Sequence, residues 1–166
     1  MAKVSSSIKK IPYRIEIQSP TGNMVIADEP IDKGGKDTGF SPKELLASAL
    51  AACTSATVRM YADNKGWALE EIKMDVELEH EVAANRTLID RKIEFIGDLT
   101  AEQRKRLLAV ANACPVHKIL SGAVAIRTTA TAEIGQLKRR TQKNVEKSQQ
   151  TKVKARSASR SVLMKL

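Results

Sequence analysis

The chain has 166 residues, with 42% hydrophobic and only 3% aromatic side chains, and a net charge of +9. This length allows one ordinary domain with tails, and the composition predicts a core of small aliphatic side chains. No apolar run reaches the roughly 18 residues of a membrane-spanning helix, and the start of the chain lacks the apolar segment of a secretory signal. We therefore expect a cytoplasmic protein without a membrane partner, whose two cysteines serve chemistry or packing rather than a permanent disulfide.

The positive charge is concentrated in the last part of the sequence. Residues 135–166 carry ten Lys or Arg residues and one Glu, so residues 1–134 are neutral overall. Few apolar and no aromatic side chains occur in this tail, which predicts disorder. Nucleic-acid binding through phosphate contacts is one interpretation of the tail, but we favour a solvated extension and do not expect nucleic acid as a partner.

The first third of the chain predicts a lead-in, a hairpin and a loop. Residues 1–10 are polar, basic and without periodicity, which indicates a flexible lead-in to a domain over residues 11–134. Residues 13–18 and 24–27 alternate in hydrophobicity around a Pro-Thr-Gly-Asn break, which predicts a β-hairpin. The glycine-rich residues 33–40 lack the Lys-Ser/Thr ending of a phosphate-binding loop, so we interpret them as a packing loop.

The longest predicted helix covers residues 41–65. Ser41 is its predicted N-cap, Pro42 suits the first turn, and Glu44 completes a capping box. Apolar and small side chains cover too much of its surface for a helix with one wet side, so we expect it to be largely enclosed. The short side chains would let a sheet, or a twin helix from a second subunit, approach closely. Cys53 lies in the middle of this surface.

Two alternating segments follow, residues 72–80 and 88–97. Each predicts a strand with one wet face, and together they predict an antiparallel sheet that is covered on one side. His80 continues the inward face of the first strand, so we interpret it as a core histidine rather than a ligand. Arg91 shares the inward face of the second strand with apolar residues.

The remaining elements complete an α+β pattern. A second capping box begins at Thr100 and opens an amphipathic helix, which must end before Pro115 because the residue before a proline disfavours the helical region. A short helix over residues 115–120 and a last strand over residues 124–132 follow. Strands, helix, strands, helices and strand in this order predict an α+β fold.

The two cysteines are the candidates for chemistry. Because Pro115 occupies the first turn of the short helix, Cys114 falls at its cap, where free N–H groups favour a thiolate. His117 lies three residues further on. The alternative for Cys114 is a buried, inert thiol. Cys53 lies in mid-helix among alanines, so it is either inert packing or a reactive thiol that needs a nearby cation.

A metal site is the other chemistry to consider, since the chain has two cysteines and two histidines. The spacing of Cys114 and His117 suits a metal, but no Cys-x-x-Cys pair accompanies it. We therefore expect neither a metal nor a cofactor. The four candidate ligands are Cys53, His80, Cys114 and His117.

Two motifs resemble the OsmC/Ohr family of thiol peroxidases. Residues 39–57 read GFSPKELLASALAACTSAT and residues 114–120 read CPVHKIL, and the similarity runs from about residue 13 to 132. The resemblance implies an intertwined homodimer, with antiparallel sheets packed on two central helices and active sites at the subunit interface. It also implies that Cys53 attacks an organic hydroperoxide and becomes a sulfenic acid, which Cys114 resolves as a disulfide. A dithiol reductant then restores both thiols.

The sequence departs from the organic-hydroperoxide branch of that family at two places. Lys43 stands where that branch has a glutamate, and Glu44 follows one step later, a rotation of about 100° around the helix. The N-terminal arginine of that branch has no counterpart within residues 19–23, and Arg14, Lys36 or Lys43 are the stand-ins. Both departures make the chain more similar to the OsmC-like branch.

The sequence thus predicts a thiol-dependent peroxidase of oxidative-stress defence, with Cys53, Cys114 and Glu44 as its site residues. Glu44 has a second interpretation, as a helix cap alone. The alternative function is a non-enzymatic relative that binds a small molecule or a partner through the interface cleft. The missing arginine and the displaced acid favour that alternative.

Overall fold

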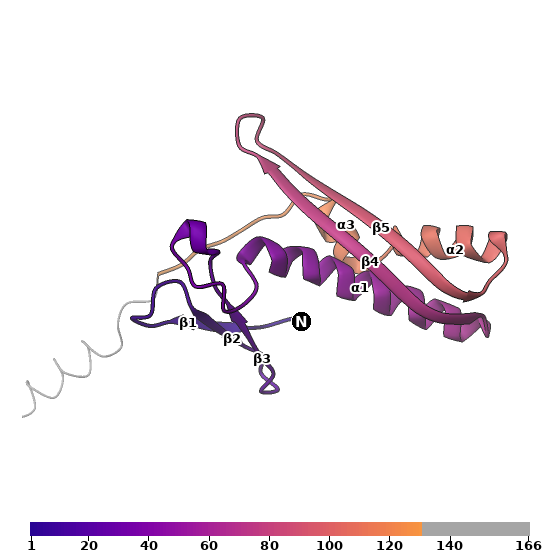
Figure 1. Ribbon diagram of the computed structural model, residues 1–166, viewed down its shortest axis with the longest axis horizontal. Coiled ribbons are helices and arrows are strands. Elements are labelled where there is room, and N and C mark those ends of the chain that lie inside the picture. The colour runs from indigo at the N-terminus through magenta and orange to yellow at the C-terminus, as the bar shows by residue number, and fades with distance from the viewer. Residues whose placement is uncertain (131–166) are drawn as a thin grey trace, which may run out of the picture. The chain divides into compact units, whose positions relative to one another are not determined.

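The computed structural model describes residues 1–130 of a chain that divides into two units, Met1–Val124 and Ala125–Leu166. The described part of the first unit contains two antiparallel sheets and helices, as the α+β prediction requires (Figure 1). The second unit is described over residues 125–130 only, and these form no helix or strand. The predicted tail, residues 135–166, lies outside the described residues.

The N-terminal sheet has the strand order β1-β2-β3, with all pairs antiparallel. Its strands are β1 (Ser5–Ile8), β2 (Ile15–Gln18) and β3 (Met24–Ala27). The predicted hairpin is confirmed as β2 and β3. The flexible lead-in is wrong for Ser5–Ile8, whose four side chains are exposed. Backbone pairing with β2 holds this strand, and such pairing needs no hydrophobic alternation.

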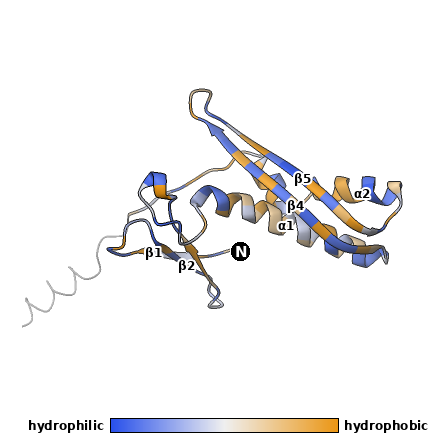
Figure 2. Ribbon diagram, viewed as in Figure 1, coloured by the Kyte–Doolittle hydropathy of each residue, from blue (hydrophilic) through white to orange (hydrophobic). Residues whose placement is uncertain are grey.

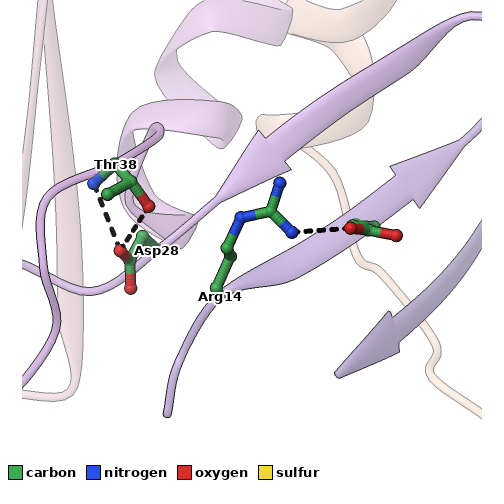
Figure 3. Close-up of polar contacts among 4 residues, drawn as sticks. Arg14, Asp28 and Thr38 are labelled. Atoms are coloured by element: carbon green, nitrogen blue, oxygen red, sulfur yellow. Dashed lines mark hydrogen bonds and ion pairs between the residues drawn. The ribbon is translucent and has the colours of Figure 1, made fainter. Parts of the chain in front are cut away.

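A buried carboxylate organises the glycine-rich loop between β3 and the first α-helix. Asp28 is 2% exposed, and its side chain accepts hydrogen bonds of 2.7 to 3.3 Å from the backbone N–H groups of Glu29, Lys36 and Thr38 and from the Thr38 hydroxyl. Figure 3 shows the two bonds from Thr38. The Thr38 hydroxyl contributes most to lowering the pKa of Asp28, against the opposing effect of burial. The loop N–H groups thus bind a carboxylate of the protein itself, which agrees with the prediction of a packing loop.

The first α-helix, α1 (Pro42–Lys65), begins with the predicted capping box between Ser41 and Glu44. Its buried residues form one stripe at helical spacing, and the small residues on the opposite side are exposed, so the prediction of a largely enclosed helix is wrong for the single chain. Helix α1 would suit a membrane span by length and composition, but its buried stripe packs into a protein core. The stripe consists of Ala47, Leu50, Thr54, Val58 and Ala62.

The long hairpin pairs β4 (Ala68–Glu81) with β5 (Arg86–Asp98) and packs on α1. Polar and apolar residues alternate along both strands (Figure 2), which confirms the prediction of one covered face. The expectation for His80 is wrong, because this residue is exposed near the end of β4 and its Nδ1 lies 2.9 Å from Thr87 Oγ1. The alternation of polar and apolar residues continues to the end of β4, but the elements that cover the inward face do not reach His80.

Two further helices follow the hairpin, α2 (Ala101–Ala111) and α3 (Pro115–Leu120), and both confirm the prediction. Helix α2 begins with the predicted capping box at Thr100. The main core lies between α1, the hairpin and α2, and consists of Val58, Ala62, Leu69, Phe95, Leu99, Leu107 and Ala111.

A β-bulge shapes the end of the hairpin next to α2. The bulge lies between Leu69 and Glu71 of β4, next to Gly97 of β5. Gly97 has a φ of 139°, and a Cβ atom there would lie 2.0 Å from the carbonyl oxygen of Ala68, so only glycine fits. Arg104 of α2 donates to the Gly97 carbonyl oxygen at 3.0 Å and ties the helix to this bend.

The last predicted strand, residues 124–132, is not formed over the described residues 124–130. Its alternating side chains are present, and Val124 and Ile126 are exposed. Alternation supplies the two faces of a strand, but the strand also needs a neighbouring backbone for its hydrogen bonds. The described part of this chain provides none.

Candidate active site

Cys114 lies at the junction of α1, α2 and α3 and is fully buried. It is the N-cap of α3, as the sequence predicted, because Pro115 starts that helix. The backbone N–H of His117 donates to Cys114 Sγ at 3.3 Å, and Thr54 Oγ1 of α1 lies 3.3 Å from the same sulfur. A buried sulfur with two hydrogen-bonding neighbours is a polar thiol rather than a packing residue.

The surroundings of Cys114 favour its ionised form. Burial alone raises the pKa of this thiol. The hydrogen bonds with the Thr54 hydroxyl and the His117 backbone N–H, the nearby Cys53 thiol and the positive charge of Arg91 all lower the pKa, and together they outweigh the effect of burial. The pKa of Cys114 therefore lies below its ordinary value, as expected for a reactive thiol.

Cys53 directly precedes Thr54 on α1 and is partly exposed. It continues the line of Leu46 and Leu50 at i+7 and i+3, and therefore shares their side of the helix. Both cysteines are free, and the Cys53 thiol is near enough to Cys114 to contribute to the lowering of its pKa. The structure thus brings together two thiols that are 61 positions apart in the sequence.

Arg91 is the cation of this site. Its guanidinium extends from β5 and donates from Nη1 to Thr54 Oγ1 at 2.6 Å and from Nη2 to Asn112 Oδ1 at 2.9 Å. In the sequence Arg91 falls on the inward face of its predicted strand, and no role was predicted for it. A charged residue at an inward position between isoleucines was the signal that could have identified it.

A cleft of about 550 Å³ opens beside these residues. One wall comes from α1, another from the first half of β5, and a third from α3. Its apolar and polar side chains together suit a small amphipathic molecule. The lining residues are Leu46, Leu50, Thr87, Ile89, Arg91, Asn112, His117, Leu120 and Ser121.

The structure does not place Glu44 with the two thiols. Nine residues separate it from Cys53 on α1, which corresponds to about 13 Å along the axis and the opposite side of the helix. The Glu44 carboxylate instead accepts the backbone N–H of Ser41 at 2.7 Å, and this bond, with the Ser41 side chain, lowers the pKa of Glu44. In the single chain, Glu44 has the capping role that was its second interpretation.

The three stand-in cations are also elsewhere. Arg14 pairs with Glu16 of β2 at 2.6 Å and lowers the pKa of that carboxyl (Figure 3). Lys36 and Lys43 are exposed, one in the glycine-rich loop and the other in the first turn of α1. Arg91, and none of these three, contacts the cysteine site within the described chain.

The candidate metal ligands do not converge. Within residues 1–130, no group of three or more His, Cys, Asp or Glu side chains is arranged to hold a metal ion. His80 lies near the tip of the hairpin and contacts Thr87, while His117 lines the cleft.

The fold and the paired thiols define a class of protein, the α+β proteins in which a central helix and a helix N-cap each contribute one cysteine. The family model described as OsmC-like protein matches residues 34–129, so the chain belongs to the OsmC-like family. A comparison with curated proteins gives no match.

Solved structures show the same fold. A Psychrobacter arcticus protein named for osmotic stress and detoxification response is 25% identical, with a TM-score of 0.64 over 72% of this chain and 88% of that one. An OsmC-like protein of Mycoplasma pneumoniae is 21% identical, with a TM-score of 0.64 over 74% and 89%. The organic hydroperoxide resistance protein OhrB of Bacillus subtilis is 24% identical, with a TM-score of 0.53 over 76% and 95%.

Proposed function

We propose that this protein is a thiol-dependent peroxidase that reduces organic hydroperoxides in oxidative-stress defence. The observation that carries the proposal is the proximity of Cys53 to a buried Cys114 whose pKa is lowered. Arg91 and His117, which neighbour Cys114, also line the cleft. Family membership and the likeness to a hydroperoxide resistance protein support it. We expect the protein to act in the cytoplasm.

The first half of the proposed cycle oxidises Cys53. The Cys53 thiolate attacks the terminal oxygen of the hydroperoxide, and the O–O bond breaks. The alkoxide takes up a proton and leaves as the alcohol, while Cys53 becomes a sulfenic acid, oxidised by two electrons. We assign this step to Cys53 because it is partly exposed, whereas Cys114 is fully buried.

The second half forms and then reduces a disulfide. The Cys114 thiolate attacks the sulfenic sulfur, the S–O bond breaks, and hydroxide leaves as water after gaining a proton. A small dithiol then attacks the Cys53–Cys114 disulfide through a mixed disulfide, restores both thiols and is itself oxidised to a disulfide. A low pKa suits Cys114 in both steps, since a stabilised thiolate is present for resolution and is the better leaving group in reduction.

We further propose that the active form is a homodimer. Helix α1 exposes a continuous face of small and apolar side chains in the single chain, and a second copy would cover it. Glu44 could then act at the site of the other subunit, which is the remaining way for this carboxylate to be a site residue. The face consists of Ala49, Ala52, Ala56 and Met60.

The test of the peroxidase proposal is a count of free thiols together with the intact mass, before and after one equivalent of an alkyl hydroperoxide. The full chain should lose both thiols within seconds. The Cys114→Ser variant should lose one thiol and gain the mass of one oxygen atom, because its sulfenic acid has no resolving partner. The Cys53→Ser variant should keep its remaining thiol and leave the hydroperoxide unconsumed.

The alternative function, a non-enzymatic protein that binds a small molecule or partner through the cleft, predicts the opposite result. Both thiols would survive the hydroperoxide in the full chain, and Cys53→Ser would not differ from it. Consumption of the hydroperoxide at the same rate by Cys53→Ser would also contradict our proposal, because it would remove Cys53 from the reaction.

A further inference from the structure

The Arg91 guanidinium is joined to the Cys114 sulfur through one hydroxyl group. Arg91 Nη1 lies 2.6 Å from Thr54 Oγ1, and Thr54 Oγ1 lies 3.3 Å from Cys114 Sγ. Thr54 and Cys114 are both fully buried, so water does not substitute for these contacts. The three residues come from β5, α1 and the N-cap of α3, which makes the chain of contacts a feature of the tertiary fold.

The direction of the two hydrogen bonds follows from the groups involved. A guanidinium has donors only, so Thr54 Oγ1 must accept the bond from Arg91. A Cys114 thiolate carries no proton, so in that state the Thr54 hydroxyl donates its single proton to the sulfur. Because a sulfur that accepts hydrogen bonds is stabilised as an anion, Arg91 acts on Cys114 by fixing which way the Thr54 hydroxyl points.

The guanidinium is itself held in place. Arg91 Nη2 donates to Asn112 Oδ1 at 2.9 Å, at the end of α2 and two residues before Cys114. No ion pair neutralises Arg91 within residues 1–130. The charged and titratable groups that face Cys114 are Cys53 from α1, Arg91 from β5 and His117 from α3, and a thiolate at Cys114 is the negative charge that this arrangement accommodates.

We propose that Arg91 is a positioning residue which, by orienting the Thr54 hydroxyl toward Cys114, keeps the Cys114 sulfur in its thiolate form. The inference rests on the proposed function for its catalytic meaning, since the thiolate is the species that resolves the Cys53 sulfenic acid. It deepens that function by assigning to Cys114 a cation on β5. The sequence had offered Arg14, Lys36 and Lys43 as stand-in cations for Cys53.

The test titrates the Cys114 thiolate by its ultraviolet absorbance in full-length Cys53→Ser protein, where one cysteine remains. Arg91→Met removes the donor and the charge, and Thr54→Val removes the hydroxyl at nearly constant shape. Each should raise the titration midpoint by about one pH unit, which is about tenfold less thiolate at a pH below both midpoints. The matched controls are Lys92→Met, on the exposed face of β5, and Thr54→Ser, which keeps the hydroxyl. Both controls should titrate like the parent.

The double variant separates a relay from two independent effects. If Arg91 acts through Thr54, then Arg91→Met adds little once Thr54 is valine, because the relay is already broken. Full additivity of the two shifts would overturn the relay, as would unchanged midpoints in both single variants or an equal shift in Thr54→Ser. Circular dichroism verifies that each variant is folded. If Arg91→Met does not fold, the titration of Thr54→Val tests the proposal.

The outcome is independent of the peroxidase assay, because the titration uses neither a hydroperoxide nor a reductant. In one outcome the thiols fail to react with hydroperoxide, while the titration midpoint of Cys114 still shifts in the Arg91→Met and Thr54→Val variants. That result would disprove the proposed function and support the relay. If the protein reduces hydroperoxide but the Cys114 midpoint does not shift in either variant, the proposed function stands and Arg91 has no role in activating Cys114.

Discussion

Arg91 supplies the positive charge of the cysteine site within the described residues. Its guanidinium contacts Thr54 and Asn112, two neutral groups, and lies on a strand face that is otherwise apolar. A partly buried cation without an ion pair is unfavourable unless it serves a nearby anion. In the proposed relay a Cys114 thiolate is that anion, and the arginine and the thiolate would stabilise one another.

Asp28 is the second residue whose charge is used inside the fold, and its effect on stability depends on pH. Its pKa is lowered in the folded protein, chiefly by the Thr38 hydroxyl. A carboxyl with a lowered folded pKa stabilises the protein above its unfolded pKa of about 3.9, and this contribution is lost as the pH falls through the folded pKa. Asp28→Asn should therefore lower the melting temperature at neutral pH, and the difference from wild type should shrink below about pH 4.

Melting curves of the two proteins between neutral pH and the acid limit of folding would measure this effect. Asp32→Asn is the matched control, since Asp32 lies in the same loop, in the short 3-10 helix η1 (Ile31–Lys33), with its side chain 73% exposed. The control should melt like wild type at each pH. A constant difference between Asp28→Asn and wild type at all pH values would contradict the charge-based explanation.

At the scale of elements, local sequence predicted helix starts and strand faces well. The capping boxes at Ser41 and Thr100 appear where the sequence indicated, because a cap depends on residues within one helical turn. The alternation in β4 and β5 also survives in the structure. These signals are short-range, so the rest of the fold does not change them.

Properties that depend on the surroundings of an element could not be predicted in the same way. β1 has no hydrophobic alternation and exists through backbone pairing with β2, and residues 124–130 have the alternation but no pairing. The pairing of Cys53 with Cys114 came from the family resemblance, while the role of Arg91 needed the tertiary contacts of β5 with α1. A site built from three elements becomes visible only when those elements are placed.

The bulge at the end of the hairpin gives an element-scale prediction. Gly97→Ala should destabilise the protein by about 2 kcal/mol or more, because its φ of 139° is unfavourable for alanine and the new Cβ would lie 2.0 Å from the Ala68 carbonyl oxygen. Urea unfolding followed by circular dichroism would measure the loss.

Gly66→Ala is the control for this substitution. Gly66 also has a positive φ, 63°, as the C-cap of α1, but a Cβ there would meet no atom within 4 Å. The control should cost about 1 kcal/mol, the price of the left-handed conformation alone. If the two variants lose the same stability, the close approach of Ala68 does not matter and the bulge tolerates a side chain.

At the scale of the whole molecule, helix α1 is covered on one side and exposed on the other within the described residues. The core of α1, the hairpin and α2 uses one side of α1, and the small residues on the other side meet no other element of the described chain. A face of this kind costs free energy in water and is usually covered by a partner. A second copy of the chain is the occupant that we propose.

The homodimer can be tested by placing a charge on that face. Ala56→Glu keeps a good helix former at an exposed position of α1, so the single chain should fold as before. In a dimer the carboxylate would be buried without a partner, and burying an unpaired charge costs several kcal/mol. Sedimentation at micromolar concentration should therefore find wild type at twice the mass of the chain and Ala56→Glu as a monomer. Lys105→Glu, at an exposed position of α2, changes the net charge in the same direction and should stay dimeric. A monomeric wild type, or a variant that is dimeric like its control, would show that this face of α1 is not the subunit interface.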